Sequence, residues 1–226
     1  MLGSYNLIDI SQPIDHKSAV FPGDEAFSKK ITQSYHDSKV LNLTAFSMSP
    51  HVGTHADAPV HIQGELPPAE TRKDRTAGEL PLAPYLGSCV VLDVTEQIDH
   101  MNGITPAHVS ERLEAFRAFP ERVLLKTMAE VHYDKFENRY PWISADLVDY
   151  LAQRGTRLVG LDTPSVDPVD SKSLKTHHVL LQHGMVWLEN LDLTHAEEGE
   201  YILIALPLKL MEIEASPVRA VLLKTH

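Results

Sequence analysis

The chain has 226 residues, of which 43% are hydrophobic and 23% are charged, and this composition predicts a globular protein with a substantial core. A net charge of −11 argues against nucleic-acid binding, and no apolar run approaches the roughly 20 residues of a membrane-spanning helix. The single cysteine, Cys89, excludes a disulfide within the chain, is expected to be buried, and fits a reducing cytoplasm. The N-terminus lacks the basic and apolar regions of a signal peptide.

Short apolar runs and helix-capping signals predict the elements in chain order. Seven runs rich in Val, Ile or Leu predict buried strands: Tyr5–Ile10, Cys89–Val94, Arg122–Thr127, Arg157–Leu161, Met185–Leu188, Tyr201–Leu206 and Val218–Leu223. Capping residues, prolines and glycines predict helices from Thr105 to Phe116, from Ser144 to just before Gly155, and from Ser173 to His183. The prolines between Pro59 and Pro84 predict a long loop. We therefore expect one α/β domain over residues 1–226, with more strand than helix.

A dense group of potential metal ligands follows Pro50. The segment reads His51-Val-Gly53-Thr54-His55-Ala-Asp57-Ala-Pro59-Val-His61. Imidazoles and carboxylates are the ligands from which hydrolytic sites for zinc and similar ions are built. Gly53 and the flanking prolines disfavour a long helix, so we expect a turn or a short helical segment. His61 can serve as a proton shuttle, as another ligand, or as a donor to a ligand.

Further candidates lie beside the later predicted strands. The pair His177-His178 precedes Glu189, which emerges at the end of a buried apolar run. A carboxylate at that place can bridge two metal ions, or it can face solvent at the strand end. Asp162 and Ser165 follow another strand, where they can line a site or cap the turn.

These residues together resemble the cyclase-like metal-dependent hydrolase family, whose motif is His-x-Gly-Thr-His-x-Asp-x-Pro-x-His. The chain matches every fixed position of this motif between His51 and His61. The resemblance continues over nearly the whole chain, in the segments Asp9–Ile14, Pro22–Asp24, Pro84–Cys89, Arg122–Thr127, Gly160–Pro168 and Ala205–Lys209. It implies a β-rich α/β fold of the swivelling β/β/α type and a homodimer.

The resemblance also implies a site with two divalent metal ions, usually zinc; manganese or cobalt also suits imidazole and carboxylate donors. By motif, one ion is held by His51, His55 and Asp57, and Asp57 also reaches the second ion. His177 binds the second ion and Glu189 bridges both; His177 is chosen over His178 because in the family the bridging glutamate lies twelve positions after this histidine. The same motif makes His61 the general acid and base.

Within the family, the chain is most similar to the branch that hydrolyses N-formyl-L-kynurenine to L-kynurenine and formate in tryptophan breakdown. This likeness implies that metal-bound hydroxide attacks the formyl carbon of a small aromatic formamide. Phe21 stands where the family often has a tryptophan against the aromatic substrate, so we expect Phe21 to contact it. Thr163 and Ser165 are candidates to hold the ends of the substrate. The alternatives are a hydrolase of isatin or another small amide, and a metal-binding module without catalytic activity.

Overall fold

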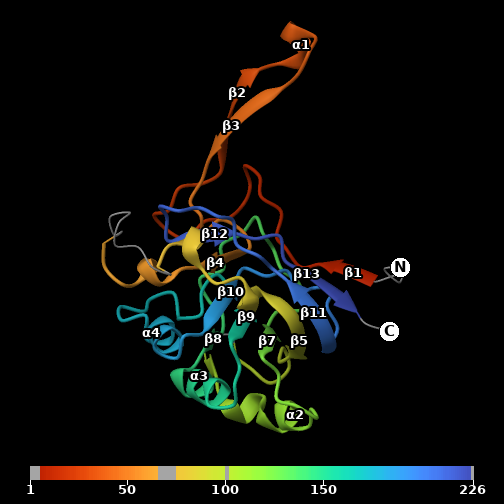
Figure 1. Ribbon diagram of the computed structural model, residues 1–226, viewed down its shortest axis with the longest axis vertical. Coiled ribbons are helices and arrows are strands. Elements are labelled where there is room, and N and C mark those ends of the chain that lie inside the picture. Colours follow the sequence, from red (N-terminus) through yellow and green to blue (C-terminus); the bar gives the residue numbers. More distant parts are fainter. Residues whose placement is uncertain (1–5, 66–74, 100–101, 225–226) are drawn as a thin grey trace.

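A nine-stranded sheet forms the centre of the molecule (Figure 1). The computed structural model describes residues 6–65, 75–99 and 102–224. In spatial order the strands are β1 (Asn6–Asp9), β13 (Val221–Lys224), β11 (Gly199–Ile204), β5 (Leu86–Asp93), β7 (Arg122–Lys126), β9 (Leu158–Leu161), β10 (Val186–Glu189), β4 (His55–Asp57) and β12 (Ala215–Pro217). The four strands from β5 to β10 pair in parallel, and the strands on either side of them pair antiparallel. The mixed α/β fold with more strand than helix is thereby confirmed.

Each of the seven predicted apolar runs forms a strand of this sheet, with bounds shifted by a few residues, but β1 is mostly exposed, so its predicted burial was wrong. Tyr5, at the start of the first run, lies outside the described residues. The central strands read as continuous apolar runs because both faces of the sheet are covered. In β5, Val90 and Leu92 pack into the core on one face, while Cys89 and Val91 pack into the core on the other. The expected burial of Cys89 is confirmed.

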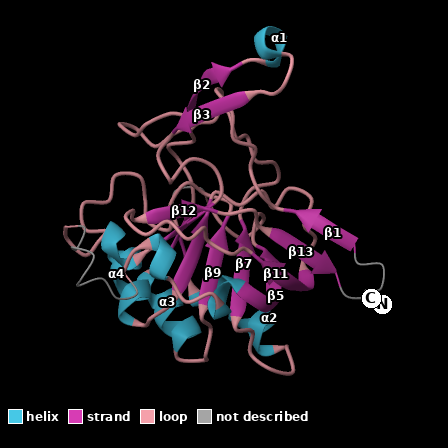
Figure 2. Cartoon of the chain, turned by 45° about the horizontal axis from the view of Figure 1, so that its top comes forward, coloured by secondary structure: helices cyan, strands magenta, loops and turns pink. Residues whose placement is uncertain are grey.

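Three helices lie together on one side of the sheet (Figure 2): α2 (Ser110–Glu114), α3 (Ala145–Ala152) and α4 (Lys175–Gln182). They fall within the three predicted helical segments, the first of which begins with a 3-10 turn at Pro106–His108. The Ser144 side chain caps α3 by accepting a hydrogen bond from the Leu147 N–H, as its sequence signal predicts. Their apolar residues, including Leu113, Leu147 and Leu180, pack against β5, β7, β9 and β10.

The histidine-rich motif departs from its expected local structure. His55–Asp57 forms strand β4, so the expectation of a turn or short helical segment was wrong for the middle of the motif, whereas His51 lies in a turn. The strand pairs with both β10 and β12, and the hydrogen bonds to these neighbours stabilise it although its own sequence has no strand pattern. Only Pro59–His61, at the end of the motif, forms a 3-10 turn.

The predicted loop from Pro59 to Pro84 is described only in part, because residues 66–74 lie outside the described residues. Its described parts include 3-10 turns at Ala77–Glu79 and Ala83–Tyr85. A short pair of strands, β6 (Gly103–Ile104) and β8 (Trp142–Ile143), adds to the helical side. Among the described residues, no helix combines the length and apolarity that crossing a membrane requires.

A hairpin that the sequence did not predict projects from the rest of the molecule (Figures 1 and 2). Strands β2 (Ser28–Gln33) and β3 (Leu43–Ser47) pair antiparallel, and the short helix α1 (Tyr35–Ser38) lies at their tip. Every residue of both strands is exposed to solvent. Residues 28–47 are called the arm.

Candidate functional site

Six side chains that the sequence singled out converge where β4 pairs with β10. The register sets His55 opposite Glu189, and Asp57 lies two residues further along the same face of β4. His177 comes from α4, and the other two histidines come from the turns on either side of β4. The converging residues are His51, His55, Asp57, His61, His177 and Glu189.

Asp57 lies at the centre of this cluster and is buried. Its Oδ1 lies 3.1 Å from His51 Nδ1 and 3.4 Å from His55 Nε2. Its Oδ2 accepts a hydrogen bond of 3.0 Å from the Trp187 indole N–H and lies 3.6 Å from His177 Nε2. One carboxylate oxygen of Asp57 therefore faces His51 and His55, and the other faces His177.

Glu189 completes the centre from β10. Its Oε2 lies 3.3 Å from His55 Nε2, and its Oε1 lies 3.5 Å from His177 Nε2. The Val166 N–H donates a hydrogen bond of 2.8 Å to Oε1 and fixes the carboxylate. Since Glu189 is only 3% exposed, the alternative of a solvent-facing carboxylate at a strand end is excluded.

Hydrogen bonds on the far side of two imidazole rings determine which nitrogen faces the carboxylates. His55 Nδ1 lies 2.9 Å from the Gly53 carbonyl oxygen, and His177 Nδ1 lies 2.6 Å from Asp167 Oδ2. Both partners can only accept, so Nδ1 carries the proton in each ring. In the neutral ring, Nε2 then presents a lone pair to Asp57 and Glu189.

A nitrogen lone pair that faces a carboxylate oxygen is repelled by it unless a cation lies between the two atoms. His55 Nε2 and Asp57 Oδ1 are both buried, and neither has a hydrogen-bond partner among the described residues. The nitrogen and oxygen donors, together with these unpaired atoms, fit a divalent cation. By distance they form two groups of three that share Asp57, within which the ligand atoms lie no more than 4.8 Å apart: His51, Asp57 and His61, and His55, Asp57 and Glu189.

Burial and neighbouring charges shift the pKa values of the cluster's histidines in opposite directions. Burial alone lowers the pKa of His51, but the carboxylates of Asp57, Glu214 and Glu189 raise it to about 10. Burial likewise opposes protonation of His177, and the carboxylates of Asp167, Asp57 and Glu189 raise its pKa to about 10. The pKa of His61 is lowered, chiefly by burial. Burial therefore favours the neutral imidazole of His61, which is able to accept a proton.

The cluster opens into a cavity of about 950 Å³. His61 and Glu189 are among its lining residues, and residues 19–24 and most of residues 128–139 form two of its walls. Phe21 lies in the first of these walls, and its ring meets that of Phe136 edge to face with centroids 5.2 Å apart. The cavity thus has an aromatic wall that includes Phe21 and Phe136.

Among the residues after β9, Asp162 and Ser165 line the cavity. Asp162 is buried and accepts hydrogen bonds from the Thr127 and Met128 N–H groups, so it also anchors the start of the second wall. Thr163 is fully buried, and its hydroxyl donates to the Ser165 carbonyl. Thr163 therefore does not lie where it could hold a substrate.

Two residues that orient the cluster were missed by sequence reasoning. Asp167 accepts hydrogen bonds from the Thr176 and His177 N–H groups as well as from the His177 ring. Trp187 binds Asp57 across the cluster. Asp167 lies in a polar turn, and its only sequence signal was that of a carboxylate shortly after a buried strand. Trp187 lies in an apolar run and had no signal that distinguishes it from a core residue.

Comparison with known proteins gives four findings. The family model described as "Putative cyclase" matches residues 8–168. The kynurenine formamidase of Paracidovorax citrulli is 42% identical over 221 residues, which cover 96% of this chain and 95% of that protein. A solved protein from Bacillus stearothermophilus, described as a predicted metal-dependent hydrolase, has a TM-score of 0.78 at 26% identity, covering 99% of this chain and 100% of that one.

Isatin hydrolase A from Labrenzia aggregata is also similar in structure. Its TM-score is 0.83 at 24% identity, covering 98% of this chain and 94% of that one. At this identity the likeness shows a shared fold alone.

Proposed function

Since the chain belongs to the Cyclase family, we propose that it is a metal-dependent amide hydrolase that converts N-formyl-L-kynurenine and water to L-kynurenine and formate. One observation supports this most strongly. Buried imidazole and carboxylate atoms that have no hydrogen-bond partner in the described part of the chain converge beside a cavity with an aromatic wall. A formamide on an aromatic ring matches both features, because its formyl group is small and its ring can lie against Phe21.

We assign the metal ligands as the family motif implies. His51, His55 and Asp57 would hold one ion, and His177 would hold the second, with Asp57 and Glu189 shared between the two. The absence of thiolate and the presence of imidazole and carboxylate favour zinc, although manganese and cobalt suit the same donors. Bound ions of this kind lower the pKa of a water molecule and polarise a carbonyl oxygen.

His61 would move the proton during the reaction. Its neutral imidazole lines the cavity, 3.9 Å from Asp57 Oδ2, and is 28% exposed. It takes a proton from the water molecule that attacks the formyl carbon. It then donates that proton to the aryl nitrogen as the carbon–nitrogen bond breaks, so formate and the free amine leave.

Phe21 and Phe136 would bind the aryl ring of the substrate, and Ser165 is positioned to contact its polar end. Isatin, a cyclic amide on an aromatic ring, is the alternative substrate. It also suits an aromatic wall, and Phe21 in place of the family's tryptophan lacks the indole N–H that could distinguish the two. We further propose a homodimer in the cytoplasm, which the family resemblance and the single cysteine favour.

The test is hydrolysis of N-formyl-L-kynurenine followed by absorbance, with isatin assayed in parallel. We expect turnover of the formyl substrate to exceed that of isatin, to be lost on treatment with a chelator, and to return with zinc. Preference for isatin would retain the metal site and replace the substrate. Turnover of neither substrate by zinc-loaded protein would favour the metal-binding module without catalytic activity.

A further inference from the structure

Two side-chain amides, those of Gln12 and Asn190, line the cavity but do not belong to the cluster of histidines and carboxylates. Both residues are partly buried. Their backbones form hydrogen bonds, whereas neither side-chain amide has a hydrogen-bond partner in the described part of the chain. Each amide carries two N–H donors and one acceptor oxygen, so both are available to a ligand in the cavity.

The backbone sets these two residues beside each other. Ser11 pairs with Leu191 in an antiparallel bridge, so Gln12, the next residue of one segment, lies beside Asn190, the preceding residue of the other. Leu191 is fully buried in the core, while Gln12 and Asn190 line the cavity. The two amides therefore come from adjacent segments and reach the same cavity.

The Thr54 hydroxyl connects both residues to the cluster. The Gln12 N–H donates a hydrogen bond of 2.9 Å to Thr54 Oγ1, and this hydroxyl donates one of 2.5 Å to the Asn190 carbonyl. Thr54 directly precedes His55, and Asn190 directly follows Glu189. Each amide is thus anchored next to a residue to which we assign a metal ligand.

We propose that the amides of Gln12 and Asn190, here called the amide pair, bind the ketone oxygen of the aromatic substrate. The inference rests on the proposed function, since it concerns the substrate of that same site. In N-formyl-L-kynurenine the ketone carbon is attached to the ring carbon adjacent to the one that bears the formamide nitrogen. Isatin carries its ketone at the corresponding position. Either substrate, with its amide group at the cluster, therefore brings a ketone oxygen close to the amide pair.

The neutral character of the amide pair suits a ketone. N–H donors satisfy a neutral carbonyl oxygen without a countercharge, whereas a carboxylate or an ammonium group that enters a cavity needs an opposite charge. Charges of both signs lie elsewhere in the cavity, with Lys135 and Glu137 in the wall formed by residues 128–139. The amide pair thus fixes the ring beside the cluster and leaves the charged end of the substrate to that wall.

The first test is ligand binding, which requires no turnover. The probes 2-aminoacetophenone and 2-ethylaniline differ only in the ketone oxygen, and each is titrated by calorimetry into the zinc-loaded full chain. We expect the natural protein to bind the ketone about tenfold more tightly, as one or two neutral hydrogen bonds provide. Gln12→Met and Asn190→Gly should each reduce this ratio about threefold, and the double variant should abolish it. Glycine is chosen because Asn190 has φ +54°, which glycine adopts without strain.

Each substitution has a matched control outside the cavity. Gln182→Met replaces an exposed glutamine of α4. Lys39→Gly replaces a residue of the arm whose φ of +56° is nearly that of Asn190. Both controls should bind 2-aminoacetophenone as the natural protein does. Circular dichroism and the zinc content of each variant check that the fold and the cluster are retained.

Kinetics give the second test. With N-(2-acetylphenyl)formamide, which has the ketone, KM should rise about 3- to 10-fold in each single variant. With formanilide, which lacks the ketone, KM should stay within about twofold of the natural value. An equal loss with both substrates would indicate a structural role and overturn the proposal.

The binding test also separates this proposal from the proposed function. A natural protein that binds the ketone no more tightly than 2-ethylaniline, or a preference that survives in the double variant, would overturn the amide pair as a ketone site. A preference that is lost in the double variant supports the amide pair, even if neither the formyl compounds nor isatin is hydrolysed. That last result would overturn the proposed function alone.

Discussion

At the scale of single residues, the cluster depends on side chains that do not themselves face the cavity. Asp167 holds the Nδ1 proton of His177 and thereby turns Nε2 toward Asp57 and Glu189. Partners of this kind fix the ring and raise its basicity as a metal ligand. The neighbouring backbone N–H groups of Thr176 and His177 also need both oxygens of the Asp167 carboxylate.

We predict that Asp167→Asn weakens zinc binding by about 10- to 100-fold while the fold is retained. The asparagine offers one acceptor oxygen where the aspartate offers two, so the ring of His177 loses its fixed orientation. The measurement is competition with a chelator of known affinity. Asp149→Asn is the matched control, because Asp149 also lies 2.6 Å from a histidine, His183, but on the exposed side of α3 and α4. Equal affinities in the two variants would contradict the role of Asp167.

The role of His61 can be separated from that of the metal ligands. We predict that His61→Ala binds zinc as the natural protein does and loses about 10²- to 10⁴-fold in kcat, the usual contribution of a general acid and base. Metal content by elemental analysis and the rate with N-formyl-L-kynurenine are both measured. His132→Ala, which removes a second histidine from the cavity lining, serves as the control. Loss of one zinc ion from His61→Ala would make His61 a ligand instead.

The sequence predicted the residues of the cluster better than it predicted the residues that orient them. His51, His55, Asp57 and His61 are close in sequence and share a motif, so the sequence alone was enough to identify them. Asp167 lies in a different turn from the motif, and Trp187 looks like an ordinary core residue. Their roles depend on the packing of α4 and β10 beside β4, which a local pattern does not encode.

At the scale of elements, β4 is held in place by the turn that precedes it. Gly53 has φ +67°, and a Cβ there would lie 2.9 Å from Cγ1 of Ile14. Its carbonyl also accepts the hydrogen bond from His55 Nδ1. The position therefore requires glycine for two reasons, backbone conformation and close packing.

We predict that Gly53→Ala lowers the free energy of unfolding of the chelated protein by about 2 to 4 kcal/mol and also weakens zinc binding. Gly155→Ala is the control. Gly155 has φ +94° but no atom within 4 Å of the added Cβ, so it isolates the backbone effect, about 1 kcal/mol. Denaturant unfolding with chelator measures both variants. Equal losses would show that the contact with Ile14 is relieved at no cost.

Strands buried on both faces were predictable from their own sequence, and strands stabilised by contacts with distant segments were not. The runs Val90–Leu92 and Val123–Leu125 are apolar throughout because their alternate residues face two cores, one on each side of the sheet. Strand β4 has a polar sequence although it is buried, because His55 and Asp57 contact one another in the cluster. The arm strand β2 reads Ser-Lys-Lys-Ile-Thr-Gln, which carries no strand signal at all.

At the scale of the whole molecule, folding concentrates negative charge around the cluster, and a cation of some kind must balance it. In metal-free protein the cation is the proton. His51 and His177 have pKa values of about 10 there, against an ordinary value of 6.5. Groups whose pKa is raised on folding stabilise the protein when protonated. That stabilisation is complete below about pH 6.5 and is lost as the pH rises toward 10.

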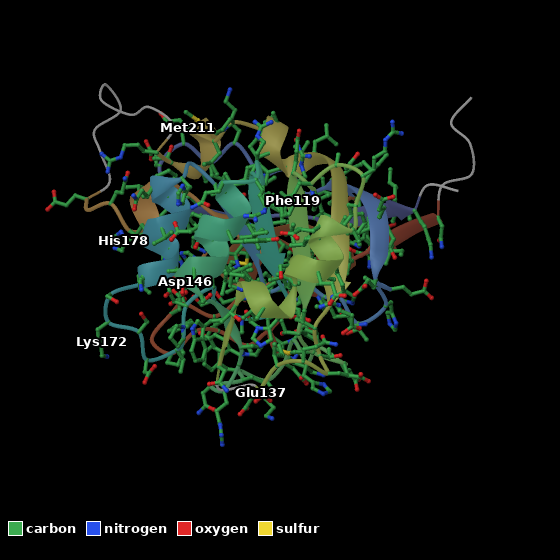
Figure 3. All side chains as sticks on the ribbon, turned by 90° about the horizontal axis from the view of Figure 1, so that it is seen from below. Phe119, Glu137, Asp146, Lys172, His178 and Met211 are labelled. Carbon is green, nitrogen blue, oxygen red and sulfur yellow. The ribbon has the colours of Figure 1, made fainter. Side chains whose placement is uncertain are left out.

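We therefore predict that the melting temperature of the chelated protein falls between pH 6.5 and 9, while the stabilisation given by added zinc grows over the same range. Zinc binds the neutral imidazoles, so it competes with the protons and releases them on binding. His177→Gln should reduce the slope of melting temperature against pH. His178→Gln should leave it unchanged, because His178 lies exposed on the surface of α4 (Figure 3). A melting temperature of chelated protein that rises over this range would mean that protons do not substitute for the metal ions, and that the cluster is balanced in another way.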